Sequence, residues 1–242
     1  MEGVNRESRT SIHFSTSYII ARVWRPDKTV AVDFQKALLE NELDFAQTNI
    51  WPNMFKLLRT EPSNLQIKLE SLGPQVSSIQ VSSLNPQYDL EMFGKEAAAA
   101  CDAHQRTWQK GGCQIINCSA KIQHLYSCRE HAFKYLWETR LGQVGADLRC
   151  LGARPVAGGG LRLVMPPYAA EGAEPCSIEI RIESFLREQK KLFVETAFTW
   201  PRPRLLRETE KFDPQERLRI VQRYATEQVW DFLVLKENTG QQ

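Results

Sequence analysis

The segment Trp200–Arg207 and the helix predicted after it have the residue types that could bind a polyanion or a partner protein. The candidate contact residues are Trp200, Arg202, Arg204, Arg207, Arg219 and Arg223. Arginine forks bind phosphates, and aromatic rings stack on unpaired bases. Residues 181–223 hold 11 basic and 7 acidic residues, a net charge of only +4. An aromatic residue beside arginines is also typical of protein interfaces, so we favour a partner contact over nucleic acid.

The densest group of possible metal ligands is Cys113, Cys118, His124, Cys128 and His131. Zinc is usually held by closely spaced pairs of nitrogen or sulfur ligands. The spacing here spans a predicted strand, in which we expect Cys113 and Cys118 to point to opposite faces. The six cysteines are scattered through a chain too large to need disulfides, which favours reduced thiols. The sequence therefore predicts packed cysteines, with no metal and no cofactor.

Two further motifs suggest chemistry but fit structural roles better. Cys101 and His104 lie one helical turn apart and could pair as nucleophile and base. However, His104 continues an apolar stripe that ends at Trp108, which predicts a core position. The glycines 158–160 precede a predicted strand, whereas a phosphate loop leads into a helix. We therefore expect a turn at these glycines and no catalytic residue at Cys101.

Charged residues on a predicted hairpin form the last candidate site. Glu179 and Glu183 alternate with isoleucines, and Glu195 lies on the returning strand. Paired carboxylates can perform acid–base chemistry when one of them is desolvated. Because Arg181 lies between Glu179 and Glu183, we favour cross-strand ion pairs on a solvated face.

These residues need elements that position them, and the apolar spacing of the first half predicts five. We expect a strand over 11–24, a helix over 33–47 capped by Asp33, a hairpin of strands 65–69 and 79–81, and a helix capped by Asp89 that ends near 108. The Gly73-Pro74 pair predicts the hairpin turn.

The second half repeats this order with one additional hairpin. We expect a strand over 113–126, a helix over 130–141, short strands over 148–153 and 161–165, a hairpin of 178–182 with 192–200, and a helix capped by Asp213 that reaches 232. The helix start has a proline at its first position and a capping-box Glu216.

Together these elements predict an α+β protein with two antiparallel sheets, each with helices on one face. We expect flexible ends at 1–10 and 237–242, a first half over 11–110 and a second half over 111–236. The shared order is consistent with a duplicated strand-helix-strand-strand-helix unit. It is equally consistent with the fact that many α+β chains of this length can be divided in this way.

The composition limits the classes of protein to which this chain can belong. The chain has 242 residues, 42% of them hydrophobic, and a net charge of +2, as expected of a globular protein and not of a general polyanion binder. We find no secretory leader, and the longest apolar stretches are too short to cross a bilayer. The expectation is a cytoplasmic protein that does not enter a membrane.

The order of the elements resembles a sporadically distributed bacterial family of uncharacterised single-chain proteins of similar length. The resemblance lies in the opening strand 17–23, the helix 88–108, the strand 115–126 with the helix after it, the paired strands 178–200 and the closing helix. It implies the architecture and a bacterial origin, and no catalytic residue.

The sequence thus favours a non-enzymatic interaction or assembly protein over an enzyme. Its partner would be another protein, or a second copy paired through a sheet edge. An RNA-binding or single-stranded-DNA-binding protein remains an alternative. A small-molecule enzyme with a site between the two halves, at the carboxylates or at Cys101 and His104, is the other.

Overall fold

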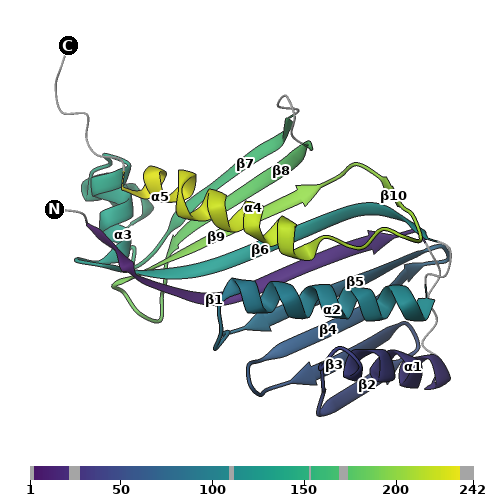
Figure 1. The fold of residues 1–242 in the computed structure, drawn as a ribbon. Helices are drawn as coiled ribbons and strands as arrows, with labels where there is room; N and C mark the ends of the chain where they lie inside the picture. The colour runs from purple at the N-terminus through teal and green to yellow at the C-terminus, as the bar shows by residue number, and fades with distance from the viewer. Residues whose placement is uncertain (1–2, 22–27, 109–111, 153, 169–173, 235–242) are drawn as a thin grey trace.

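The structure is a computed structural model and describes residues 3–21, 28–108, 112–152, 154–168 and 174–234 (Figure 1). The first half contains β1 (Val4–Ile20), α1 (Lys28–Leu39), β2 (Gln47–Trp51), β3 (Met54–Arg59), β4 (Leu65–Gly73), β5 (Val76–Leu84) and α2 (Leu90–Trp108). The second half contains β6 (Cys113–Cys128), α3 (Ala132–Lys134), the π-helix η1 (Tyr135–Arg140), the 3₁₀-helix η2 (Gly145–Leu151), β7 (Gly160–Tyr168), β8 (Cys176–Ser184), β9 (Lys191–Trp200), β10 (Arg204–Leu206), α4 (Pro214–Thr226) and α5 (Gln228–Leu233).

All ten strands belong to one antiparallel sheet, whereas two sheets were expected. The strand order is β2-β3-β4-β5-β1-β6-β9-β8-β7, and β10 pairs with the start of β6. The halves join where β1 pairs with β6, from Val4 opposite Cys128 to Ile20 opposite Ile115. Two separate sheets would leave both of these long strands with an unpaired edge, and pairing them satisfies their backbone groups.

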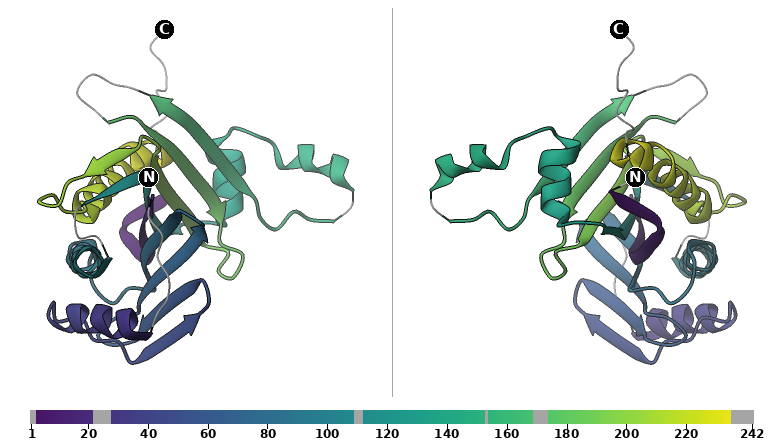
Figure 2. Two further views of the ribbon diagram at one scale, coloured as in Figure 1. Left: turned by 90° about the vertical axis from the view of Figure 1, so that its right-hand side faces the viewer. Right: turned by 90° about the vertical axis from the view of Figure 1, so that its left-hand side faces the viewer.

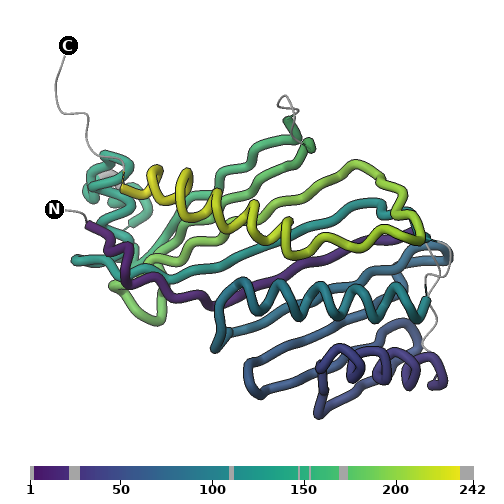
Figure 3. Tube along the Cα trace, in the orientation of Figure 1, coloured from purple at the N-terminus to yellow at the C-terminus, as the bar shows by residue number. Residues whose placement is uncertain are grey.

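One face of the sheet is apolar and covered by helices. Phe14, Tyr18 and Ile20 alternate along β1 with polar residues, so they point to a single face, where they are buried. Helices α1, α2 and α4 pack against this face, and α2 and α4 run side by side over the centre of the sheet (Figure 3). This core includes Phe198 and Val221 of the second half, so it crosses the boundary between the halves.

A second core lies at the opposite end of the sheet from α1. Tyr126, Ile182 and Leu192 pack there with buried residues of α3, η1 and α5, among them Tyr135 and Trp230. Figure 2 views the molecule along the sheet from both ends, with α1, α2 and α4 on one side of the strands. Each helix that has buried side chains therefore contributes them to the same face of the sheet.

Several expected boundaries differ in the first half. Residues 4–10, expected in the N-terminal tail, extend β1, and Val4 is fully buried. Helix α1 begins at Lys28, so Asp33 lies inside it, and it ends at Leu39 before a turn in which Glu42 has a φ of 60°. Strands β2 and β3 were not predicted. The residues 22–24 of the expected first strand lie outside the described residues.

The second half also departs from the expectation. Residues 148–153 were predicted as a strand, but 145–151 form the 3₁₀-helix η2, and Gly152 takes a φ of 102°. Leu148 and Cys150 alternate with Arg149, and this alternation suggested a strand. Among the described residues, however, β7 pairs only with β8 and forms the edge of the sheet, so no strand from 148–152 is added to it. The closing helix breaks at Glu227 into α4 and α5. The expected C-terminal tail, 237–242, lies outside the described residues.

Candidate functional site: the open face of the sheet

The second face of the sheet is polar, and we call it the open face. In register across the strands its polar residues are His13, Ser15, Ser17, Gln66, Lys68, Ser78, Gln80, Ser82, Ser119, Lys121, Gln123, Glu179, Arg181, Glu183 and Glu195. The same face also carries apolar and aromatic side chains, namely Ile19, Trp51, Met54, Leu58, Leu125, Val164, Phe193 and Ala197. Most of these side chains are half-buried, as expected for a sheet face flanked by neighbouring strands with no layer above it. In the described part of the chain, the buried helix residues all pack on the other face.

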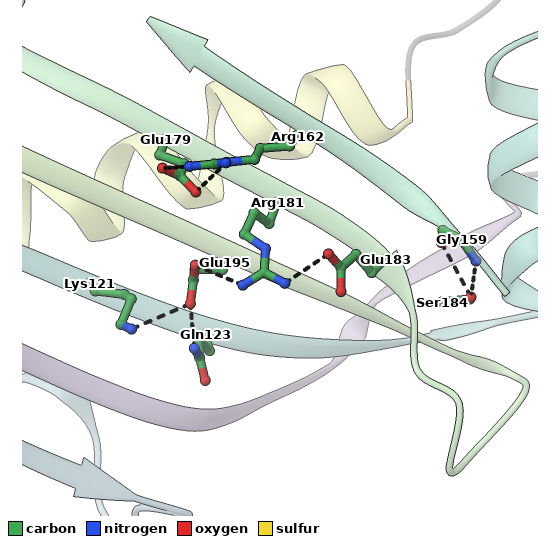
Figure 4. A network of polar contacts seen from close by, with 9 residues as sticks. All are labelled: Lys121, Gln123, Gly159, Arg162, Glu179, Arg181, Glu183, Ser184 and Glu195. Carbon is green, nitrogen blue, oxygen red and sulfur yellow. Dashed lines mark hydrogen bonds and ion pairs between the residues drawn. The ribbon is translucent and has the colours of Figure 1, made fainter.

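Glu195 is at the centre of an ion-pair network on this face (Figure 4). It is only 6% exposed, with Oε2 3.5 Å from Lys121 Nζ and Oε1 3.7 Å from Arg181 Nη1. The amide of Gln123 also donates to Glu195 Oε2. Arg181 continues the network to Glu183 at 2.9 Å. The register predicts these contacts, because Glu195 is directly opposite Gln123 on one side and Arg181 on the other.

The outermost pair of the network joins β7 to β8. Arg162 donates from Nε and Nη2 to the two carboxylate oxygens of Glu179, at 2.8 and 2.9 Å. This bidentate hydrogen bonding lowers the pKa of Glu179. The hydrogen bond to Glu183 likewise raises the pKa of Arg181. Each carboxylate of the expected acidic group lies within ion-pair distance of an arginine, which confirms the expected ion pairs.

This arrangement suits recognition better than acid–base catalysis. A catalytic acid needs a carboxyl whose neutral form is favoured, yet Glu179 is shifted in the opposite direction. His13, on β1 opposite Gln123, has its pKa lowered to about 4, mainly by burial and secondly by Lys121. Three cavities of the molecule are described below, and the carboxylates of the network line none of them.

Trp200 lies in the core, so it cannot serve as the exposed aromatic that the sequence suggested. It is 2% exposed and packs beside Phe198, and the Arg217 guanidinium lies 4.5 Å above its ring. Period-two alternation places Trp200 on the apolar face of β9, which the local composition of the segment did not indicate. The expected contact surface therefore loses its aromatic residue.

The arginines of the expected contact surface lie on several elements. Arg204 belongs to β10 and pairs with Asp213 at 3.3 Å. The Asp213 side chain does not cap α4, and instead accepts hydrogen bonds from Tyr18, Arg204 and Arg217. Arg202 and Arg207 are exposed at the two ends of β10. Their positive charge lies on the exposed loop residues that flank β10.

Arg219 and Arg223 lie on the solvent side of α4. They line a cavity of about 390 Å³ between α2 and α4, together with Glu91 and Glu227. Glu216 is 4.0 Å from Arg219. Acidic residues thus accompany both arginines, on the side of the molecule opposite the open face. A third cavity, of about 230 Å³ beside Asp102 and Lys211, contains none of the expected contact residues.

Cys113 and Cys118 point to the same face, contrary to the expected divergence. The register of β1 with β6 shifts between Ile19–Asn117 and Ile20–Ile115, so Ile116 is an extra residue. Such a bulge reverses the alternation, and both thiols are buried in the apolar core. Among the described residues, no three histidine, cysteine or acidic side chains are grouped as a metal site would require.

Cys101 and His104 are both buried on α2. Burial raises the pKa of the Cys101 thiol far above its usual range, because the anion would lose its hydration. His104 stacks against Trp108, with ring centroids 5.1 Å apart, as the apolar stripe predicted. A thiolate nucleophile is therefore disfavoured at this position.

Sequence reasoning missed Lys121, Gln123 and His13 as members of the polar face. The alternation of Cys118, Ala120 and Ile122 with polar residues along β6 contains this signal. Their partner Glu195 is 74 positions beyond Lys121, and only the strand order brings them together.

No described helix has the length and apolarity needed to cross a membrane. Comparison of the chain with protein-family models and with curated protein sequences gives no match.

Proposed function

We propose that this protein is a non-enzymatic binding protein that docks another protein on the open face of its sheet. The observation that supports the proposal is the contrast between the two faces of one continuous sheet. Helices pack on one face, while mainly hydroxyl, amide and ion-paired side chains line the other. A sheet stabilised by its helix-covered side does not need a polar second face for its own core, so that face is available for a partner.

The chemistry of the open face favours a protein over nucleic acid. A single-stranded nucleic acid would be bound by aromatic stacking platforms in a basic groove. The tryptophan and phenylalanine side chains in register on the open face, Trp51 on the edge strand β2 and Phe193 on β9, are separated by five strands, so they do not form a row of stacking platforms. The cations of this face alternate with carboxylates. Balanced charges with many hydrogen-bonding groups are typical of the polar part of protein interfaces. The fixed ion pairs around Glu195 would present a preformed charge pattern to that partner.

We further infer that the two halves arose by duplication, which would make the open face a surface of two similar parts. β1 and β6 are adjacent at the centre of the sheet, each is followed by a helix, and each half ends with a long helix packed on the same face. In the first half β5, the strand before α2, pairs with β1, and in the second half β9 and the short β10 before α4 both pair with β6.

The experiment compares variants of the full chain in affinity purification from its native host. Ser17→Arg and Gln80→Arg place bulk at a cross-strand pair in the middle of the open face, where the side chains are half-exposed. The matched control, Arg219→Glu with Arg223→Glu, alters the exposed side of α4. We expect a stoichiometric protein partner that survives nuclease treatment, binds directly when purified, and is weakened about tenfold or more only by the open-face variants.

Three outcomes would contradict the proposal. The first is that the open-face variants retain the purified partner as well as the wild type does. The second is that nuclease removes the bound material and the α4 variant abolishes binding, which would support the nucleic-acid alternative. The third is that no direct partner is recovered.

A further inference from the structure

The largest of the three cavities lies at the end of the molecule formed by α3, η1 and η2. It has a volume of about 890 Å³ and is lined by His131, Phe133 and Trp137 on one wall and by Arg149 and Arg154 on the other. Ligand cavities usually measure about 300 to 1,000 Å³. This cavity shares no lining residue with the open face.

The wall formed by α3 and η1 is fixed from behind. The Tyr135 hydroxyl donates to the carbonyl of Leu233 at 2.7 Å, and Arg140 Nε donates to the carbonyl of Phe232 at 2.5 Å. The Arg140 guanidinium also lies 4.2 Å from the Phe232 ring centroid. The π-helix between these anchors contains Trp137, and such wide turns are frequent at functional sites. A preformed wall reduces the ordering that a ligand would have to impose.

The polar groups of this cavity are predominantly donors. His131 Nδ1 accepts the backbone N–H of Phe133 at 3.2 Å, so the proton of the neutral ring is on Nε2, which can only donate. Arg149 and Arg154 add guanidinium donors.

Glu138, the carboxylate among the described lining residues, is itself accompanied by a cation. Glu138 Oε2 is 4.0 Å from Lys134 Nζ, and both residues line the cavity. The cavity therefore has hydrogen-bond donors that lack acceptors, and a complementary ligand would supply acceptors. An anionic oxygen group, such as a phosphate, supplies acceptors without donors and matches guanidinium geometry.

The same cavity has a flat apolar wall. The rings of Phe133 and Trp137 are stacked with centroids 5.9 Å apart and an interplanar angle of 23°. Leu148 and Val156 also line the space. A ligand that satisfied only the donors would leave this apolar surface in contact with water, so the complementary ligand has an aromatic body as well as the anionic group.

We propose that this cavity binds an aromatic organic phosphate, with the phosphate held by Arg149 and Arg154. The aromatic body would lie against Phe133 and Trp137.

Isothermal titration calorimetry of the full chain at 150 mM salt tests this, with 1-naphthyl phosphate and adenosine 5′-monophosphate as probes. The neutral 1-naphthol and inorganic phosphate are the comparison ligands. We expect at least one aromatic phosphate to bind about tenfold or more tightly than both of them, because only the aromatic phosphates engage both parts of the cavity.

Two variants and a matched control locate the binding. Arg149→Glu with Arg154→Glu should weaken the aromatic phosphate by about tenfold or more. Trp137→Ala removes one of the two stacked rings and should weaken it by roughly threefold to tenfold. Arg202→Glu with Arg207→Glu makes the same change in net charge at exposed positions outside the cavity and should have little effect.

The proposal is overturned if neither aromatic phosphate binds with a dissociation constant below about 1 mM, or if inorganic phosphate binds equally well. It is also overturned if the control variant weakens binding as much as the variant inside the cavity, since the attraction would then depend on overall charge alone. Because the partner experiment on the open face uses different residues, either proposal can fail while the other holds.

Discussion

His124 should make the stability of this protein depend on pH between 7 and 5. Its side chain is 1% exposed on the helix-covered face of β6, beside the Tyr126 ring. The Ser11 hydroxyl is 3.2 Å from Nδ1. The pKa of His124 is lowered from 6.5 to about 4, chiefly by burial and secondly by the nearby Arg9, while Gln222 partly opposes them.

The sign follows from which state binds the proton. In the folded protein His124 stays neutral until the pH falls to about 4, whereas in the unfolded chain it is protonated below 6.5. Falling pH therefore stabilises the unfolded state, and the stability present above pH 6.5 is lost progressively down to pH 4. The lowered pKa corresponds to about 3 kcal/mol in total, of which about 2 kcal/mol is lost between pH 7 and pH 5.

Urea unfolding of the wild type and of His124→Asn, at pH 7 and at pH 5, measures this contribution. Asparagine can keep a hydrogen bond with Ser11 but does not titrate in this range. His13 also has its pKa lowered to about 4 and remains in both proteins, so the comparison isolates the share of His124. We expect the free energy of unfolding to fall by about 2 kcal/mol more in the wild type than in the variant.

Equal pH dependence of the two proteins would refute this reasoning. If the variant does not fold, proton NMR of the wild type gives the same answer. A ring signal of His124 that titrates between pH 7 and pH 5 in the folded protein would mean that burial does not keep the imidazole neutral.

Two further predictions concern burial on the two faces of the sheet. Glu195→Gln should lower the free energy of unfolding by about 1 to 2 kcal/mol, because it removes the charge shared by two cations, whereas Glu183→Gln at the exposed edge of the network should change it by less than about 0.5 kcal/mol. Urea midpoints compare the pair, and equal effects would mean that the burial of Glu195 has no energetic consequence. Trp200→Ala should cost about 3 to 5 kcal/mol, since it empties a core position beneath Arg217, while Trp51→Ala, 41% exposed on the edge strand β2, should cost about 1 kcal/mol or less. Thermal unfolding distinguishes these, and a tolerated Trp200→Ala would restore this residue as a candidate contact.

The elements whose apolar residues recur with a regular spacing were predictable from the sequence. The alternation Ile178, Ile180 and Ile182 identified β8, and Asp89 does cap α2, accepting the backbone N–H of Met92 at 2.9 Å. The β4–β5 and β8–β9 hairpins were predictable for the same reason, because their partners are close in the sequence, whereas the β2–β3 hairpin was missed. The helix-covered core followed wherever a strand displayed its own alternation.

What the sequence could not indicate depends on contacts between distant strands. The pairing of β1 with β6 turns two expected sheets into one, and no local signal specifies it. Ile116 shows the same limit at one residue, since the bulge it creates decides that Cys113 and Cys118 share a face. For the candidate site, Glu195 was recognised but its partners Lys121 and Gln123 were not, because they become neighbours only through the β6–β9 register.

The open-face network also constrains how a partner can bind. Glu195 is already satisfied by Lys121, Arg181 and Gln123, so burying it further would remove little water and create no unpaired charge. A partner would instead gain its contacts from the half-exposed hydroxyl and amide groups around the central strands, such as those of Ser17 and Gln80. Binding of this kind depends on shape and hydrogen bonding more than on charge, so its affinity should fall only modestly with salt. A steep salt dependence would instead support nucleic acid bound at the exposed arginines.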